Sequence, residues 1–345
     1  MSASHVALVV GQEFRIRLRT GRWRWLLGVW VLLLALFTIL LDTGLRTGYG
    51  SEEDNSLRGV PLFGFLMCFI LGSMLVISPA LTSQAVNGDR ERGTLATLQV
   101  TRLRPLEIAT GKLLAAWGVG LVALALSVPF AGYALYRGGI QVERMAVVYG
   151  VVALLIGTVC AVSQALSALL ARSITSALLS YVVTAALTIG TVIAFGLALP
   201  LVSEERQMRA PFGGVEYTYT VQRADQVWWL LAPNPFVILA DSAPRVPPRL
   251  TREGYEIRWE SHDPLSAIGW EVRQLRMPPD YTVEDNGDGI RYYDSEGTEI
   301  PPPDELPVWP FGLGFAVLLG VASLAVTSVR LRTPADRLPR GIRVA

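Results

Sequence analysis

Apolar and polar residues follow one another in long blocks along this chain, rather than at the short periods of a half-buried strand or a surface helix. A spanning helix needs about 20 mainly apolar residues to cross roughly 30 Å of hydrocarbon. The qualifying blocks are roughly Trp25–Leu41, Val60–Ala80, Leu113–Tyr136, Met145–Ala171, Ile174–Val202 and Val308–Val329. This pattern predicts an all-α polytopic membrane protein with six transmembrane helices.

The distribution of charge supports the same class. The chain has 345 residues, with 30 Lys or Arg and 29 Asp or Glu, and all of these charged residues fall outside the six blocks. A soluble core tolerates some paired charge in its helices, whereas the interior of a bilayer strongly disfavours it. The six blocks are therefore expected to lie in lipid.

Basic residues in the short connections predict the orientation. If the N-terminus is cytoplasmic, the inner segments 1–24, 81–112, 172–173 and 330–345 hold five, five, one and five basic residues. The short outer segments 42–59 and 137–144 hold two each. We therefore expect a multi-pass membrane protein with both termini in the cytoplasm and the long segment 203–307 outside.

Residues 1–24 are expected to be a cytoplasmic or interfacial amphipathic segment. Val10, Phe14 and Leu18 recur every four residues, while Arg15 and Arg19 occupy another face. Such a helix can lie at the headgroups with its arginines toward anionic lipid. A plain positive-inside anchor explains the pattern equally well.

The segment 81–112 between blocks two and three is unusually rich in charge and in helix-forming residues. Asn87-Gly88 signals a turn or a helix start, and the residues from Asp89 favour a helix. Pro105 suits the first turn of a new helix, where its missing N–H is not needed. We expect a short helix across the membrane face, a break, and a return into block three, although an ordinary ordered loop is the alternative.

The run "DRERGTLATLQVTRLRPLEIATGKLLAAW" resembles the signature of ABC-2-type transporter permeases. In that family the segment is a coupling helix that docks on a separate ATPase subunit. This chain has Arg102 where the family often has proline, with Pro105 three residues later. The short turn around Arg172 is similar to the family's second cytoplasmic connection. The resemblance implies coupling roles for Asp89, Arg90, Glu91, Arg92, Gly93, Thr94, Leu95, Arg102, Glu107, Gly111, Lys112 and Arg172.

A second run, "WWLLAPNPFVILADSAPR" at residues 228–245, is similar to the family's "LNP" block. That block belongs to a re-entrant helical hairpin on the outer face. The positions assigned to it here are Pro233, Asn234, Pro235, Phe236 and Asp241. With the six spans, the resemblance covers roughly residues 1–245 and 308–345.

Residues 246–307 do not fit the resemblance and are expected to form a small extracytoplasmic insertion of mixed or irregular structure. "GYEIRWE" and "GIRYYDSEGTEI" are typical of short strands, and "SAIGWEVRQL" of a helix. The segment contains no cysteine, so no disulfide framework supports it. We expect a solvated, partly ordered insertion in preference to a cap that contacts cargo.

The sequence contains no motif for an ATPase. A phosphate-binding loop requires G-x-x-x-x-G-K-[ST], and the single Gly-Lys, Gly111-Lys112, is followed by leucine. Lys112 is better interpreted as an anchor at the inner end of block three. We expect no catalytic, cofactor or metal site in this chain, with ATP and Mg bound by the partner ATPase subunit.

The resemblance implies the permease subunit of an ABC exporter in the bacterial cytoplasmic (inner) membrane. Its partners would be two copies of a cytosolic ATPase and a second permease subunit, identical or related. No nucleic-acid partner is expected. An ion- or proton-driven secondary transporter is the main alternative, but it usually needs ionisable groups within the membrane. A non-transporting scaffold with an outer binding loop and a membrane-embedded hydrolase are further alternatives, the latter without a visible nucleophile and base.

Overall fold

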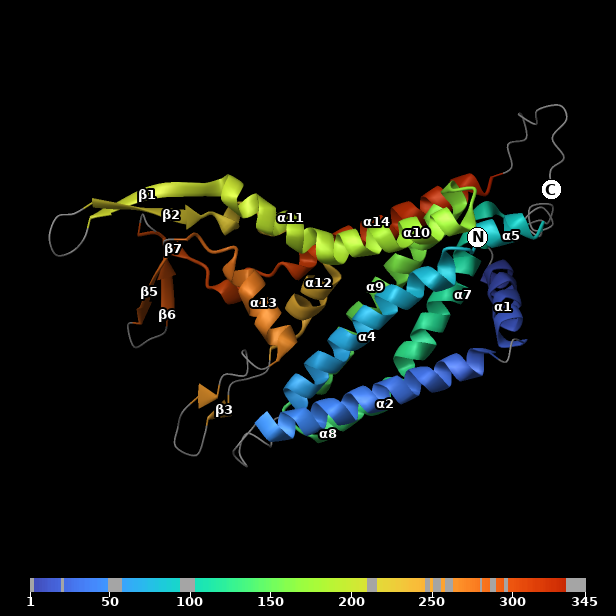
Figure 1. Cartoon of the computed structure of the whole chain (residues 1–345), viewed down its shortest axis with the longest axis horizontal. Helices are drawn as coiled ribbons and strands as arrows, with labels where there is room; N and C mark the ends of the chain where they lie inside the picture. The colour runs from blue at the N-terminus through green and yellow to red at the C-terminus, as the bar shows by residue number, and fades with distance from the viewer. Residues whose placement is uncertain are drawn as a thin grey trace. The chain divides into compact units, whose positions relative to one another are not determined.

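The computed structural model describes residues 3–19, 22–48, 58–93, 103–209, 216–245, 249–250, 256–257, 263–279, 281–285, 290–294 and 297–332. Six helical stretches in these residues are long and apolar enough to cross a membrane. They are Trp25–Thr47, Gly59–Glu91, Pro105–Tyr136, Val142–Leu169, Ser173–Val202 and Trp309–Arg330. The prediction of an all-α polytopic protein with six spans and a small mixed insertion is therefore confirmed (Figure 1).

The chain divides into two compact units, Met1–Thr184 with Phe315–Ala345, and Ala185–Gly314. The helices of the first unit include most of α10 (Ser173–Ala185) and α14 (Trp309–Arg330). The others are α1 (Ala3–Arg19), α2 (Arg22–Gly48), α4 (Gly59–Thr82), α5 (Asn87–Glu91), α7 (Pro105–Ala125), α8 (Val128–Tyr136) and α9 (Val142–Leu169).

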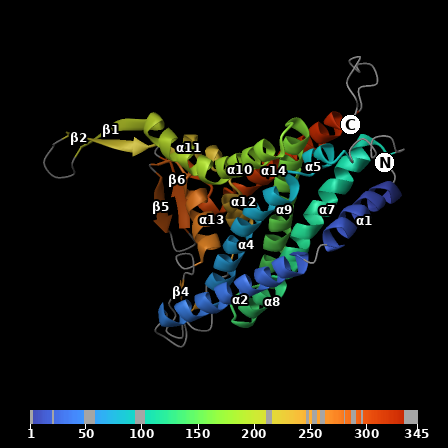
Figure 2. The same cartoon turned by 45° about the vertical axis from the view of Figure 1, so that its right-hand side comes forward.

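Helix α4 forms the centre of the first unit. It packs against α9, α7, α8 and α2, and Figures 1 and 2 show it beside α9 in both views. Phe63, Leu66 and Ile70 on α4 are fully buried. A helix that is apolar on all sides belongs in the interior of a bundle, which explains why α4 carries no charge.

The third predicted span is interrupted, a feature that the apolar block did not reveal. Helix α7 ends at Ala125 and α8 begins at Val128, with Pro129 in its first turn. Because proline has no N–H, Pro129 cannot donate to the carbonyl of Ala125 four residues earlier, and the α-helix stops there. The chain then reverses through Gly138 and Gly139, both with positive φ, before α9 begins.

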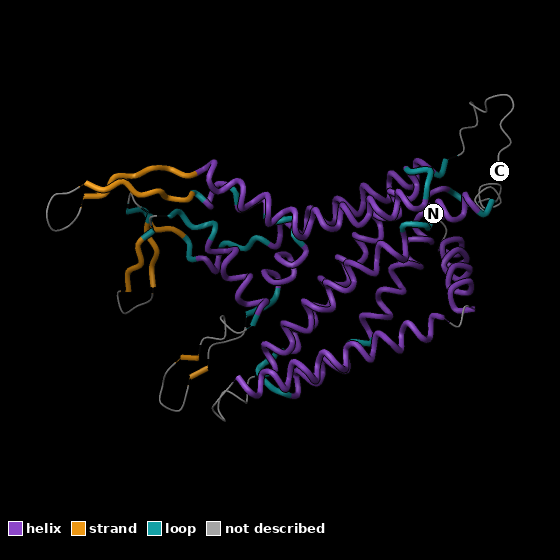
Figure 3. The backbone as a smooth tube through the Cα atoms, in the orientation of Figure 1, coloured by secondary structure: helices purple, strands orange, loops and turns teal. Residues whose placement is uncertain are grey.

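The second unit combines a helical core with small antiparallel sheets (Figure 3). Strands β1 (Ser203–Arg209) and β2 (Glu216–Gln222) form a hairpin in which Glu205 pairs with Thr220. Its remaining elements are η1 (Ala186–Gly190), α11 (Thr191–Ala198), η2 (Leu199–Val202), η3 (Ala224–Gln226), η4 (Trp228–Leu230), α12 (Pro235–Ser242), β3 (Arg249–Leu250), β4 (Glu256–Ile257), α13 (Pro264–Gln274), β5 (Thr282–Asp285), β6 (Ile290–Tyr293), β7 (Glu299–Ile300) and η6 (Pro303–Glu305).

The insertion was expected to be solvated, but its helix α13 is partly buried. The strands at 256–257, 290–293 and 299–300 and the helix at 264–274 lie where the sequence predicted them. However, α13 packs against α12, and Val272 joins Leu231 and Val237 in a buried apolar cluster. An amphipathic helix needs a partner for its apolar face, and α12, outside the insertion, supplies it.

Candidate functional site

The predicted coupling segment begins with a short helix at the end of α4. Helix α5 starts at Asn87, at the Asn87-Gly88 pair that the sequence indicated as a turn or helix start, and Gly93 follows it with a φ of 70°. Only glycine adopts positive φ routinely, so Gly93 suits the turn that ends α5. Thr94, Leu95 and Arg102 lie outside the described residues. The predicted new helix does begin at Pro105, as α7.

Helix α5 is attached to the end of α9 by its backbone. The N–H groups of Val86 and Asn87 both donate to Ser167 Oγ over 3.1 Å. Val86 is also buried in an apolar cluster with Ile108 and Ala168. A hydroxyl that accepts from two backbone donors satisfies groups that the start of a helix leaves unpaired, so α5 has a fixed position on the bundle.

Glu91 connects α5 to the turn between α9 and α10. Its Oε1 accepts from the Ser173 hydroxyl at 2.7 Å and from the Ser173 N–H at 3.4 Å, at the start of α10. Arg172, with an exposed side chain, is the preceding residue. The structure therefore brings together two predicted coupling residues that lie 81 positions apart in the sequence.

Two of the predicted residues, Lys112 and Asp89, lie inside the unit and do not form an outer surface. Lys112 is only 3% exposed and is paired with two carboxylates, Glu13 Oε1 at 2.6 Å and Asp89. Arg92 lies 3.4 Å from the other oxygen of Asp89, so two cations face two acids. The interpretation of Lys112 as an inner-face anchor of the third span stays a prediction, and the structure adds that this side chain is buried in an ion-pair network.

Glu107 and Gly111 attach α1 to the start of α7. Glu107, 2% exposed, accepts from the N–H of Arg104 at 3.0 Å, and His5 Nδ1 lies 3.1 Å from the same oxygen. At Gly111 an added Cβ would lie 2.6 Å from Val9 Cβ, so only glycine permits this approach of the two helices. The expected amphipathic helix therefore exists, with α7 as the partner of part of its apolar side.

The burial of these side chains separates the predicted residues into two groups. Glu107, Gly111 and Lys112 are buried and hold α1, α5 and α7 together, and Asp89 is half-buried with them. The exposed group, called here the exposed turn surface, comprises Arg90, Glu91, Arg92, Gly93 and Arg172. These exposed residues are the ones available to another protein. Glu13, which pairs with Lys112, was not identified from the sequence.

The second predicted segment organises the core of the other unit. Asn234 caps α12 by accepting from the Phe236 N–H at 2.9 Å, and its amide donates to Thr188 O at 2.7 Å and to Thr191 Oγ1 at 2.8 Å. Pro235 occupies the first turn of α12, the position where proline is favoured. Asn234 and Pro235 thus fix where α12 begins, while Pro233 and Phe236 are half-buried beside them.

Asp241 is buried at the end of α12, where it binds both α13 and the start of α14. Its Oδ2 accepts from the N–H groups of Val308 at 2.6 Å and Trp309 at 2.7 Å, where α14 starts. Its Oδ1 is paired with Arg273 of α13. Nearby, Arg276 lies against the rings of Trp228 and Phe311, and burial lowers the pKa of its guanidinium group, while the charge of Asp241 opposes that shift.

Comparison with known families gives one assignment. The family model described as ABC-2 family transporter protein matches residues 7–266. No curated protein matches the chain. The match includes the first part of the insertion, residues 246–266, which we expected to lie outside the resemblance, and it ends before α14. Because the match covers well over half of the chain and includes the exposed turn surface, this multi-pass membrane protein belongs to the ABC-2 transporter family, as a membrane transport component that is not itself an ATPase.

Proposed function

We propose that the chain is the permease subunit of an exporter that uses ATP hydrolysis on a separate ATPase subunit to move its cargo out of the cytoplasm. Two such permease subunits, identical or paired with a related one, act with two ATPase subunits. ATP and Mg bind to the ATPase. The complex resides in the bacterial cytoplasmic membrane with both termini of this chain inside the cell.

The observation that carries the proposal is the contact of Glu91, in the exposed turn surface, with Ser173 at the start of α10. Two connections that are far apart in sequence form one charged surface, and Ser167 fixes the backbone at the start of α5. A partner that pushes on this surface acts on the ends of α4, α9 and α10 together. That arrangement supports the transmission of motion from an ATPase to several spanning helices.

The buried ion pairs support the same proposal. Lys112 joins α5, α7 and α1 through Asp89 and Glu13, so a displacement of α5 also reaches the third predicted span. Breaking a buried pair costs several kcal/mol, which makes such a network stiff. Closure of the ATPase pair around ATP is thereby expected to shift the inner ends of these helices and to change the side to which the cavity of the permease dimer opens.

The proposal is tested by purifying the complex with its ATPase and reversing one exposed charge. Arg172→Glu is suited to this test because its side chain is exposed and lies beside the Glu91–Ser173 contact. We expect the amount of ATPase that co-purifies to fall about ten-fold, the equivalent of roughly 1.4 kcal/mol. Cargo-stimulated ATP hydrolysis is expected to fall with it.

Arg291→Glu on β6 is the matched control, since it reverses one exposed arginine in the segment predicted to lie outside the cell. It is expected to leave co-purification unchanged. If Arg172→Glu binds the ATPase as the wild type does and turnover remains coupled, the docking role of the exposed turn surface is wrong.

A further inference from the structure

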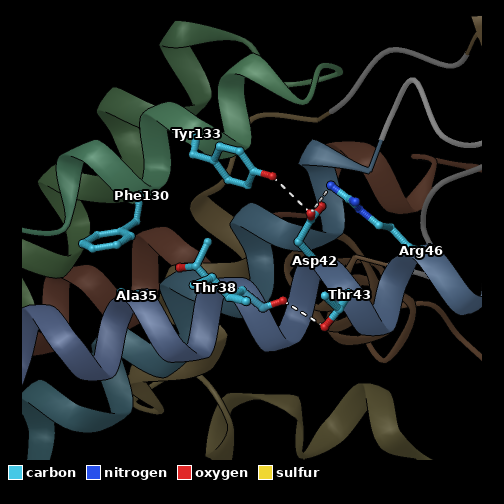
Figure 4. Close-up of a pocket in the computed structure, with 8 residues that line it drawn as sticks. Ala35, Thr38, Asp42, Thr43, Arg46, Phe130 and Tyr133 are labelled. Carbon is cyan, nitrogen blue, oxygen red and sulfur yellow. Dashed lines mark hydrogen bonds and ion pairs between the residues drawn. The ribbon is translucent and has the colours of Figure 1, made fainter.

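A pocket of about 430 Å³ lies between α2 and α8 in the first unit. Figure 4 shows Phe130 and Tyr133 of α8 facing it from one side, with Ala35 and Thr38 of α2 on the other. Its walls are mainly apolar. Polar atoms gather at one end, where Asp42 and Arg46 are located.

Asp42 has no capacity left for a ligand. Arg137 binds both of its oxygens, through Nε at 3.1 Å and through one terminal nitrogen at 2.9 and 2.8 Å. Tyr133 donates to Oδ2 at 3.1 Å, and a terminal nitrogen of Arg46 lies 2.9 Å from the same oxygen. A carboxylate accepts about four hydrogen bonds, so these donors satisfy Asp42 and no cation is needed to balance it.

The same cluster has an excess of positive charge. Two guanidinium groups, those of Arg46 and Arg137, face the single carboxylate of Asp42, which leaves one positive charge in the group. The Arg46 side chain is 53% exposed, and it forms an ion pair with Asp42. A guanidinium group has five N–H donors, so Arg46 retains donors directed away from Asp42.

The position of the cluster along the span matches the depth of lipid headgroups. The candidate span Trp25–Thr47 has 23 residues, a length of about 34 Å at 1.5 Å per residue. Asp42 and Arg46 lie in its last turns, where roughly 30 Å of hydrocarbon gives way to the polar interface. Ile39, Leu36 and Leu40 on the preceding turns of α2 are each about 60–70% exposed, so an apolar track leads away from the charged end.

We propose that this pocket binds a phospholipid with an anionic headgroup. The phosphate would accept charge-assisted hydrogen bonds from Arg46, and one acyl chain would lie against Ala35, Ile39 and Phe130. Arginine pairs with phosphate in planar, two-pronged geometry. The net positive charge of the cluster favours an anionic headgroup over a zwitterionic one, because a zwitterionic headgroup adds a cation that the arginines repel. The inference concerns one end of the first span and does not depend on which side of the membrane that end faces.

The test is native mass spectrometry of the purified full chain, titrated with dioleoylphosphatidylglycerol or with dioleoylphosphatidylcholine. We expect the wild type to retain the anionic lipid about ten-fold more tightly. Arg46→Gln should remove this preference, and Arg46→Lys, which keeps the charge, should retain part of it. Ala35→Trp fills the apolar part of the pocket and should weaken the binding of both lipids.

Arg291→Gln is the control for the loss of one exposed positive charge and should change neither affinity. A separate titration with millimolar inorganic phosphate distinguishes a lipid site from a simple anion site, because phosphate has no acyl chain and should not displace the lipid. The proposal is overturned if the wild type shows no preference, or if Arg46→Gln keeps it. It is likewise overturned if phosphate displaces the lipid or if Ala35→Trp binds phosphatidylglycerol as the wild type does.

Discussion

At the scale of single residues, the neighbours of Lys112 determine its role. An ammonium group that is 3% exposed loses most of its hydration. Glu13 and Asp89 compensate for that loss, and Asp89 is in turn shared with Arg92. The positive and negative charges of this network therefore neutralise one another. Removing a buried acid or the buried base leaves an uncompensated charge.

We predict that Lys112→Met lowers the free energy of unfolding by about 3 kcal/mol, because it leaves two acids without their shared cation. Glu13→Gln should cost less, about 1 kcal/mol, because Lys112 retains Asp89. Denaturant unfolding in detergent micelles measures both variants and the double variant. The double-mutant cycle should give a coupling energy above about 1 kcal/mol. Simple additivity of the two single changes would contradict the network.

Asp241 offers a second residue-scale prediction. Asp241→Asn keeps one acceptor oxygen but loses the charge that pairs with Arg273 and binds the start of α14. We expect a loss of about 3 kcal/mol in stability, seen as a lower unfolding temperature. Glu299→Gln, on an exposed position of β7, is the control and should change stability by less than about 0.5 kcal/mol. Equal unfolding temperatures for the two variants would exclude a special role for Asp241.

The sequence predicted the residue types of these sites better than their roles. The charged run at 89–92, Lys112 and Asp241 were recognised, but the ion pairs of Lys112 were not predicted. Its partner Glu13 lies 99 positions away, and no local pattern specifies a contact at that distance. The one available signal was that Glu13 is the sole acid in α1.

At the scale of elements, the close approach of α1 and α7 depends on Gly111. We predict that Gly111→Ala destabilises the chain, because the new Cβ would overlap Val9, and overpacking costs about 1–3 kcal/mol. Gly150→Ala in α9 meets nothing within 4 Å. It should stabilise α9 by up to about 1 kcal/mol, since alanine is the better helix former. Thermal unfolding of the two variants should therefore shift in opposite directions, and a shift in the same direction would contradict the packing of α1 on α7.

The long apolar blocks predicted the spanning helices well because length and hydropathy are local properties of the sequence. The break at Pro129 was missed, although Val128-Pro129 is a signal for it. The β1–β2 hairpin was also missed. Its second strand, "EYTYTVQ", consists mainly of aromatic and β-branched residues, which are enriched in strands, but no strand was predicted in residues 203–222. The packing of α13 required knowledge of α12 and so could not be predicted from the insertion alone.

At the scale of the whole molecule, the proposed coupling requires one membrane topology. It requires that the exposed turn surface faces the cytosol, where an ATPase can reach it, and that the β-strand insertion faces the opposite side. Sixteen basic residues in the predicted inner segments, against four in the short outer ones, favour this orientation.

The most direct measurement is side-specific labelling of single cysteines in intact cells. Cys68 and Cys160 are first replaced, and then Arg92→Cys in the exposed turn surface or Arg291→Cys on β6 is introduced. A membrane-impermeant thiol reagent should modify the position 291 variant in intact cells, and the position 92 variant only after the cells are permeabilised. Labelling of the position 92 variant in intact cells, with position 291 protected, would reverse the topology and contradict the proposed coupling to a cytosolic ATPase.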